Sequence, residues 1–288
     1  ILQKIKIIFR KIFFHKKWNI KKIKIKKINN FKDIKNAVYK SQTSEKKFDA
    51  NFIADPFFFK NKVICEYTRK YSQKGNLAII DDKKIRIIGN KNNHISFPSS
   101  FYLKEKKLDL ILPETASWKE PALFRLSRNS LSTYKKLKLD KKRFLLDPII
   151  FRKKSYFYLF ANDRELPNIL SLWVSSSLNE KFKLHKSSPI RISPAGSRMG
   201  GNIIKIKNSL FRLSQNNSSE YGNGLYIFKI VKLSKSQYKE VFVDYMNFKN
   251  KFGPHTLSIN HKKKIIVTDF YTEKFSFMST FIKVNPFW

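Results

Sequence analysis

Phe52–Phe59 has the sequence FIADPFFF, an apolar run interrupted near its start by a carboxylate and a proline. Phe144–Phe151 (FLLDPIIF) repeats this pattern further along the chain. Three other segments also start an apolar run with a polar residue or a residue typical of tight turns: Phe97–Leu103 (FPSSFYL), Arg198–Ile204 (RMGGNII) and Gly253–Ile259 (GPHTLSI). The five segments are here called heads. Further apolar or alternating runs follow each head, with turn residues between them, which is typical of β-strands.

The five heads are spaced about 45 to 55 residues apart, a length that suits a four-stranded blade. A repeat of this length is also compatible with a β-sandwich. In a propeller the first strand of each blade lines the axis, so five polar heads would meet at one end of a channel, whereas a sandwich would scatter them. The recurring head therefore predicts an all-β, five-bladed propeller with blades starting near residues 52, 97, 144, 198 and 253.

The residues before the first head are expected to complete this ring. Trp18–Ile25 (WNIKKIKI) alternates like a strand, and we expect it to close the last blade, because closure removes exposed sheet edges. The polar segment Asn29–Ala50 is expected to run over the surface as a connector. The predicted organisation is a basic segment at residues 1–15 and a propeller at residues 16–288.

Ile1–Phe14 (ILQKIKIIFRKIFF) has a helical spacing of apolar residues with Lys and Arg between them. It predicts a short basic helix that either lies on an anionic membrane surface or packs across the propeller. The segment lacks the apolar length of a membrane span and the small-residue cleavage site of a signal peptide. The single cysteine, Cys65, excludes an internal disulfide and favours a reducing compartment. We therefore expect a cytoplasmic protein, peripheral at the inner face of a membrane if the first interpretation holds.

The chain is strongly basic, with 60 Lys and Arg against 21 Asp and Glu and a formal net charge of +39. Such a charge attracts nucleic-acid phosphates. However, the lysines are spread along the whole chain, and the abundant Lys, Ile, Asn and Phe share A/T-rich codons, so a base-composition bias accounts for them. No zinc-finger spacing, aromatic RNA-binding signature or helix-turn-helix pattern accompanies the charge. We expect no specific nucleic-acid ligand.

Three acidic residues are the predicted catalytic group. Asp55 and Asp147 precede prolines at equivalent points of two blades; each is either a turn residue that caps its own backbone or a carboxylate of the channel mouth. Glu114 follows the apolar run Leu108–Leu112 and is either a strand-end acid on the rim or a buried one. Burial near other carboxylates would raise its proton affinity, as a general acid requires.

Five further residues are predicted to bind the substrate. Arg198 and His255 head the fourth and fifth blades, where Arg suits a carboxylate or phosphate and His suits proton transfer, hydrogen bonding or a purely structural role. Glu66 is a weaker version of Glu114, and Arg212 and Gln215 add polar groups on blade four. The sequence has no Cys/His cluster and no Gly-rich phosphate loop, so no metal or other cofactor is expected.

The motifs also resemble a known family when they are taken in order. FIADPFFF, CEY, KGNLAI, FPSSFYL, ILPET, LLDPIIF, YLFAND, SRMGGNI, RLSQ, YG and GPHTL resemble the N-terminal domain family of glucosamine inositolphosphorylceramide transferases. The resemblance covers Lys17 to residue 288 and implies a five-bladed propeller similar to arabinanase- and fructosidase-type glycosidases. It implies that Asp55 corresponds to their first-blade base or nucleophile, and Asp147 to their third-blade tuning acid. In many of those glycosidases the proton-donating Glu follows the tuning Asp, whereas Glu114 precedes Asp147.

The predicted function is that of a carbohydrate-active propeller, which acts on or binds a sugar of a surface polysaccharide or glycolipid. As an enzyme it would use Asp55 and Glu114 as the acid/base pair and Asp147 as an orienting group. The alternative is a non-catalytic glycan-binding module of a glycan-biosynthesis enzyme, in which the same carboxylates accept hydrogen bonds from sugar hydroxyls.

Overall fold

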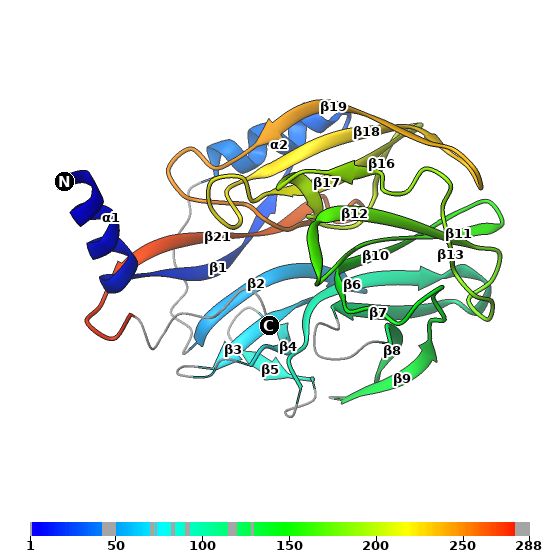
Figure 1. Cartoon of the computed structure of the whole chain (residues 1–288), viewed down its shortest axis with the longest axis horizontal. Coiled ribbons are helices and arrows are strands. Elements are labelled where there is room, and N and C mark those ends of the chain that lie inside the picture. The colour runs from blue at the N-terminus through cyan, green and yellow to red at the C-terminus, as the bar shows by residue number, and fades with distance from the viewer. Residues whose placement is uncertain are drawn as a thin grey trace.

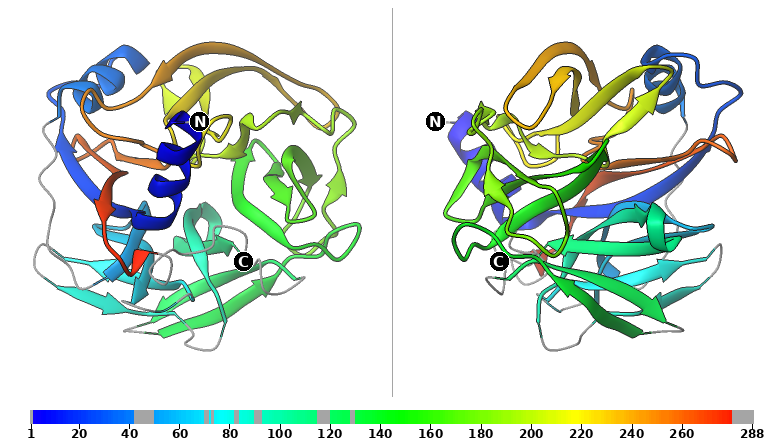
Figure 2. Two further views of the ribbon diagram at one scale, coloured as in Figure 1. Left: turned by 60° about the vertical axis from the view of Figure 1, so that its left-hand side comes forward. Right: turned by 90° about the vertical axis from the view of Figure 1, so that its right-hand side faces the viewer.

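The computed structural model describes residues 2–41, 50–69, 72, 74–81, 84–89, 93–114, 120–127 and 130–279. Within these residues five antiparallel sheets stand around a central axis (Figures 1 and 2), so the predicted five-bladed propeller is confirmed. Residues 280–288, which we assigned to the propeller, lie outside the described part of the chain.

The blades follow one another along the chain, and each is named by its strands. Blade 1 consists of β2 (Ala50–Phe59), β3 (Lys62–Arg69), β4 (Asn76–Ile80) and β5 (Ile85–Ile87). Blade 2 consists of β6 (Ser96–Leu103), β7 (Leu108–Glu114), β8 (Ala122–Ser127) and β9 (Ser130–Lys136), with the short helix η1 (Lys104–Lys106) after β6. Blade 3 consists of β10 (Leu145–Lys153), β11 (Tyr156–Asp163), β12 (Leu166–Ser175), β13 (Lys183–Leu184) and β14 (Arg191–Ile192). Blade 4 consists of β15 (Ala195–Met199), β16 (Ile204–Ile206), β17 (Ser209–Asn216), β18 (Leu225–Leu233) and β19 (Tyr238–Met246).

Blade 5 joins the two ends of the chain and closes the ring. It contains β20 (Leu257–Asn260), β21 (Ile265–Phe275) and the N-terminal strand β1 (Phe14–Lys24). β1 pairs antiparallel with β21 along its whole length, from Phe14 opposite Phe275 to Lys24 opposite Ile265. The predicted closing strand is therefore confirmed, and it covers an edge that β21 would otherwise expose.

Apolar clusters fill the spaces between neighbouring blades and hold the ring together. The cluster between blades 5 and 1, for example, joins Ile20 and Val267 to Ile53 and Cys65. Burial raises the pKa of the Cys65 thiol, so this residue is a small core side chain rather than a reactive one.

The connector after β1 differs from the prediction, because it contains a buried helix. α2 (Phe31–Lys40) begins at a capping box in which Asn30 and Asp33 each satisfy the other's backbone N–H. Phe31, Ile34 and Val38 form one apolar stripe, which is buried against the core between blades 4 and 5. The segment is polar in composition, but its few apolar residues have helical spacing, and this lets it bury one face.

The helix α1 (Leu2–Phe13) precedes β1, as predicted, and extends away from the ring (Figure 1). Among the described residues, no helix has the length and apolar character needed to cross a bilayer.

Candidate functional site

The first strands of blades 1, 2 and 3 share a bulge at the same point of their course. The register of each strand shifts across two residues, which are Asp55-Pro56, Phe97-Pro98 and Asp147-Pro148. The residue before each proline has a left-handed backbone, with φ of +52°, +43° and +46° for Asp55, Phe97 and Asp147. Bulges commonly re-aim side chains, and Asp tolerates this conformation better than most residues. The Asp-Pro motif therefore has a third copy, in which Phe97 replaces the Asp.

The second strands supply polar residues at matching positions. Glu66 lies opposite Ala54, Glu114 opposite Ser96, and Asn162 opposite Leu146, each immediately before a bulge. All three polar side chains are buried. The blades thus repeat one arrangement in which a buried polar residue of the second strand lies opposite the residue that precedes the bulge.

His255 lies between two carboxylates where blades 5 and 1 meet. Its Nε2 is 3.1 Å from Asp55 Oδ1, and its Nδ1 is 2.8 Å from Asp269 Oδ2. Asp269 also accepts the backbone N–H groups of Asp55, His255 and Thr256 at 3.0, 2.9 and 3.0 Å. The Thr256 hydroxyl donates to Asp55 Oδ1 at 2.6 Å. These contacts join residues about 200 positions apart into one buried group.

The charges of this group follow from its geometry. Burial by itself would lower the pKa of His255, but Asp269 and Asp55 outweigh it and raise that pKa to about 10. Burial would raise the pKa of Asp55, yet the His255 cation, the Thr256 hydroxyl and Arg198 together lower it. At neutral pH His255 is therefore an imidazolium, which lies between the Asp55 and Asp269 side chains.

A second buried group joins blades 2, 3 and 4. Arg198 Nε donates to Asp147 Oδ2 at 2.5 Å, and Arg198 NH2 lies 3.7 Å from Glu114 Oε2. Gln215 donates to Asp147 Oδ2 at 2.8 Å, and the Asp147 backbone N–H donates to Glu114 Oε2 at 3.0 Å. A second-strand carboxylate thus caps the bulge of blade 3, as Asp269 caps that of blade 1.

The two acids on the second strands hold their protons strongly. Burial and the Asp147 carboxylate raise the pKa of Glu114 to about 8, with Arg198 opposing them. Burial, followed by the charges of Asp55 and Glu114, raises the pKa of Glu66 well above its usual range. Glu114 is therefore largely protonated at neutral pH, and Glu66 keeps its proton to a higher pH than an exposed glutamate, while the pKa of neighbouring Asp55 is lowered.

The raised pKa of Glu114 predicts a specific dependence of stability on pH. The folded protein retains this proton at a pH where the unfolded chain has lost it, so the contribution of Glu114 becomes less favourable as pH rises from about 4.5 towards 8. Glu114→Gln cannot titrate, and it should gain stability relative to the parent by a few kcal/mol between about pH 5 and 9. Urea unfolding at several pH values measures this difference. The matched change at exposed Glu165, Glu165→Gln, should show no such trend, and a flat difference for Glu114→Gln would contradict the burial argument.

Seven of the eight predicted site residues belong to these two groups or interact with them electrostatically: Asp55, Glu66, Glu114, Asp147, Arg198, Gln215 and His255. Arg212 is the exception. Its guanidinium binds both carboxylate oxygens of Glu240, at 2.7 and 2.6 Å, and also donates to Ser214 and to the Gly196 carbonyl. All of these partners belong to blade 4, so Arg212 stabilises that blade internally and does not present its charge to the site.

Sequence reasoning missed Asp269 and Thr256. Asp269 occurs in the run VTDF of β21, where it plays the same capping role as Glu114 in blade 2. A search for the polar residue near the end of each second strand would have found it. Thr256 directly follows His255, but its partner Asp55 is visible only in the fold.

Asp55, His255 and Asp269 are the described residues that could together hold a metal ion. A metal would need neutral imidazole, whereas the raised pKa of His255 keeps its ring protonated between the two carboxylates. A metal ion bound here would therefore have to displace the proton that Asp55 and Asp269 hold on the His255 ring.

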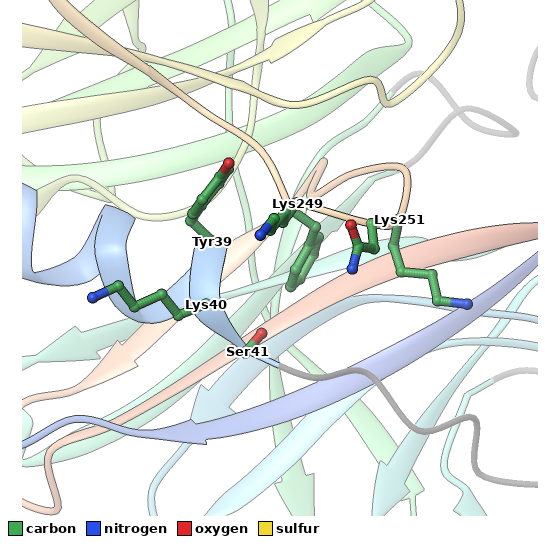
Figure 3. Close-up of a pocket in the computed structure, with 7 residues that line it drawn as sticks. Tyr39, Lys40, Ser41, Lys249 and Lys251 are labelled. Atoms are coloured by element: carbon green, nitrogen blue, oxygen red, sulfur yellow. The ribbon is translucent and has the colours of Figure 1, made fainter.

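A separate pocket of about 400 Å³ lies between the end of α2 and the loop after β19 (Figure 3). It is lined by Tyr39, Lys40, Ser41, Phe248, Lys249, Asn250 and Lys251. Lys40 and Lys251 extend away from each other, so this pocket does not concentrate its positive charge at one point. It contains none of the acidic residues described above.

Comparison with known proteins identifies relatives over most of the chain. The family model described as glucosamine inositolphosphorylceramide transferase 1, N-terminal, matches residues 15–275. A protein of Oryza sativa subsp. japonica named glucosamine inositolphosphorylceramide transferase 1 is 29% identical over 222 residues. Its namesake from Arabidopsis thaliana is 28% identical over 214 residues. Each alignment covers 68% of this chain but only 28% of the relative.

Solved structures of glycoside hydrolases have a related chain course. A family 117 glycoside hydrolase from Zobellia galactanivorans is 11% identical, with a TM-score of 0.48, and the match covers 89% of this chain and 90% of that one. An α-L-arabinofuranosidase from Podospora anserina, solved in complex with cellotriose, is 9% identical, with a TM-score of 0.48 and coverage of 76% and 78%. Similarity at this level concerns the course of the chain and not its chemistry.

Proposed function

The chain belongs to the family defined by the N-terminal part of glucosamine inositolphosphorylceramide transferase 1, and on this basis we propose that its propeller acts on or binds a sugar at the end of the channel. The relatives' name describes a sugar transferase, and this chain spans 28% of their length, so the transferase activity is a property of the named proteins. The finer proposal is a sugar belonging to a surface polysaccharide or glycolipid.

The observation that carries the proposal is the opposite shift of the pKa values of two buried acids whose charges interact, Glu114 beside Arg198 and Asp55 beside His255. Glu114 has a pKa raised to about 8, while the pKa of Asp55 is lowered. A pair in which one carboxyl is protonated and the other ionised suits glycosidic chemistry, since one protonates the leaving oxygen and the other attacks or activates a nucleophile. We assign Glu114 the role of proton donor, Asp55 that of base or nucleophile, and Asp147 that of an orienting group held by Arg198.

Unpartnered polar atoms and aromatic rings beside this cluster support a hydroxyl-rich ligand. Asn162 Oδ1 and Ser197 Oγ are buried and have no hydrogen-bond partner in the described structure. Buried polar atoms of this kind usually pair with water or a ligand. The half-buried Tyr221 ring, whose centroid lies 5.2 Å from that of His255, is an aromatic group of the kind on which sugar rings stack.

A non-catalytic glycan-binding module is the second candidate, and the occupancy of the carboxylates favours it. Asp55 already accepts from Thr256 and faces His255, and Asp147 already accepts from Arg198 and Gln215. A carboxylate with strong internal partners is less available as a nucleophile, yet its cluster still shapes a binding site.

Asp55→Asn separates these candidates, because it keeps the side-chain shape and removes the charge. With p-nitrophenyl glycosides of glucosamine, arabinofuranose and xylose as probes, an enzyme should lose turnover by about 10²-fold or more in Asp55→Asn. A binding module should show no turnover in the parent, and its affinity for the free sugars in calorimetry should fall in the variant. Asp109→Asn, on the same strand as Glu114, serves as the matched control, and thermal melts establish that both variants fold. If a responsive sugar is turned over and bound equally by parent and Asp55→Asn, the site assignment is wrong.

Three further expectations from the sequence stay proposals. These are a cytoplasmic location, a peripheral position at the inner face of a membrane, and the absence of a specific nucleic-acid ligand.

A further inference from the structure

One side of α1 is apolar, and the rest of the described structure leaves it uncovered. Ile5, Ile8, Phe9 and Ile12 are 45–57% exposed. Of the two interpretations of this segment, packing across the propeller would bury these side chains. An exposed apolar helix face of this kind commonly marks an interaction site.

The C-terminal end of β21 and the turn after it extend this apolar face. Phe275, Phe277 and Met278 are 49–78% exposed. The Phe275 ring centroid lies 6.3 Å from that of Phe9 and 6.0 Å from that of Phe13, and Phe277 lies 5.9 Å from Phe13. Residues from opposite ends of the chain therefore form one continuous patch, here named the α1 surface: Ile5, Ile8, Phe9, Ile12, Phe275, Phe277 and Met278.

The charge around the α1 surface selects the kind of partner. Residues 2–17, which form α1 and the start of β1, contain six Lys and Arg and no acidic residue, while Glu220 and Glu273 pair with Arg10 and Glu220 also pairs with Lys16. An apolar face bordered by this much positive charge matches a bilayer that contains anionic lipid, where acyl chains accept the apolar groups and headgroups attract the cations. A second copy of the same chain would instead bring two strongly positive segments together.

Ion pairs also connect α1 and the start of β1 to the segment that carries Tyr221, beside His255. Arg10 forms an ion pair with Glu220 at 3.2 Å, and Lys16 does so at the same distance. Glu220 adjoins Tyr221, whose ring lies beside that of His255. In the left view of Figure 2, α1 lies in front of the ring of blades. A surface that receives α1 therefore lies close to Glu220 and Tyr221.

We propose that the α1 surface docks the propeller onto an anionic lipid bilayer, with the Tyr221 end of the channel turned towards the headgroups. Docking places Ile8 and Phe9 from the helix and Phe277 from the turn at the level of the acyl chains. The lysines of α1 and of the first residues of β1 remain among the headgroups, where their charge is compensated.

Sedimentation with vesicles tests this proposal without any sugar, so its outcome is independent of the proposed function. The probes are vesicles of phosphatidylcholine alone and of phosphatidylcholine with about 30% phosphatidylserine, in about 150 mM salt so that weak surface attraction is screened. The parent should bind the anionic vesicles. The double variant Ile8→Asp, Phe277→Asp should bind them with an affinity that is lower by about tenfold or more.

The matched control is Ile192→Asp, Phe242→Asp, which makes the same substitutions at exposed apolar residues of β14 and β19. It has the same net charge as the test variant and should bind like the parent. Equal losses in both double variants would show unspecific attraction by the basic chain and would overturn the proposal. Failure of the parent to bind would overturn it too, as would a concentration-dependent dimer in the ultracentrifuge that only the α1-surface variant abolishes.

Discussion

Replacing His255 with alanine should lower the free energy of unfolding by about 3–5 kcal/mol at neutral pH. The imidazolium is buried between Asp55 and Asp269, at 3.1 and 2.8 Å, and its removal leaves two carboxylates facing each other without a cation. The loss should exceed that expected from the missing ring contacts alone, because each remaining charge is buried. Urea unfolding of parent and variant measures it.

The pH dependence of this loss separates charge from packing. The pKa of His255 is raised to about 10 in the folded protein, so its contribution to stability is complete below about pH 6.5 and declines as pH rises through 10. The difference between parent and His255→Ala should therefore shrink between about pH 6.5 and 10. His261→Ala, at the exposed turn before β21, should change stability by no more than about 0.5 kcal/mol. A difference that is constant with pH would reduce the role of His255 to packing.

Arg198→Met should cost a similar amount, about 3–5 kcal/mol, since Arg198 is the cation that pairs with the buried Asp147 carboxylate. Methionine fills much of the same volume, so the loss reports the unpaired Asp147 charge rather than a cavity. Thermal and urea unfolding at neutral pH measure it.

A compensating change at Asp147 provides the decisive control for this ion pair. The double variant Arg198→Met, Asp147→Asn removes both charges and keeps an acceptor for Gln215, so it should recover more than half of the lost stability. Losses that simply add would show that Arg198 and Asp147 do not act as a pair.

Local patterns in the sequence were sufficient to predict the ring but not every element in it. Trp18–Ile25 alternates, and β1 forms there because alternation gives a strand one face to bury against blade 1. The same kind of evidence was available for α2, where Asn30 and Asp33 form a capping box, but the overall polarity of the connector obscured it. Phe97-Pro98 was likewise not recognised as a copy of the Asp-Pro bulge, because the side chain differs while the backbone conformation is shared.

The repeat, the closing strand and most of the polar residues of the two buried groups could be predicted from the amino-acid sequence, because strand period, turn residues and blade length are properties of neighbouring positions. Which of these residues pair depends on the tertiary structure. Asp269 reaches the Asp55 backbone across 214 positions, while Arg212 is bound by Glu240 within its own blade. The protonation states were decided there too, since the pKa of Glu114 and the pKa of Asp55 move in opposite directions although both are buried carboxyls. Burial acts alike on both acids, and the difference arises from the nearest charge, which is Asp147 for Glu114 and His255 for Asp55.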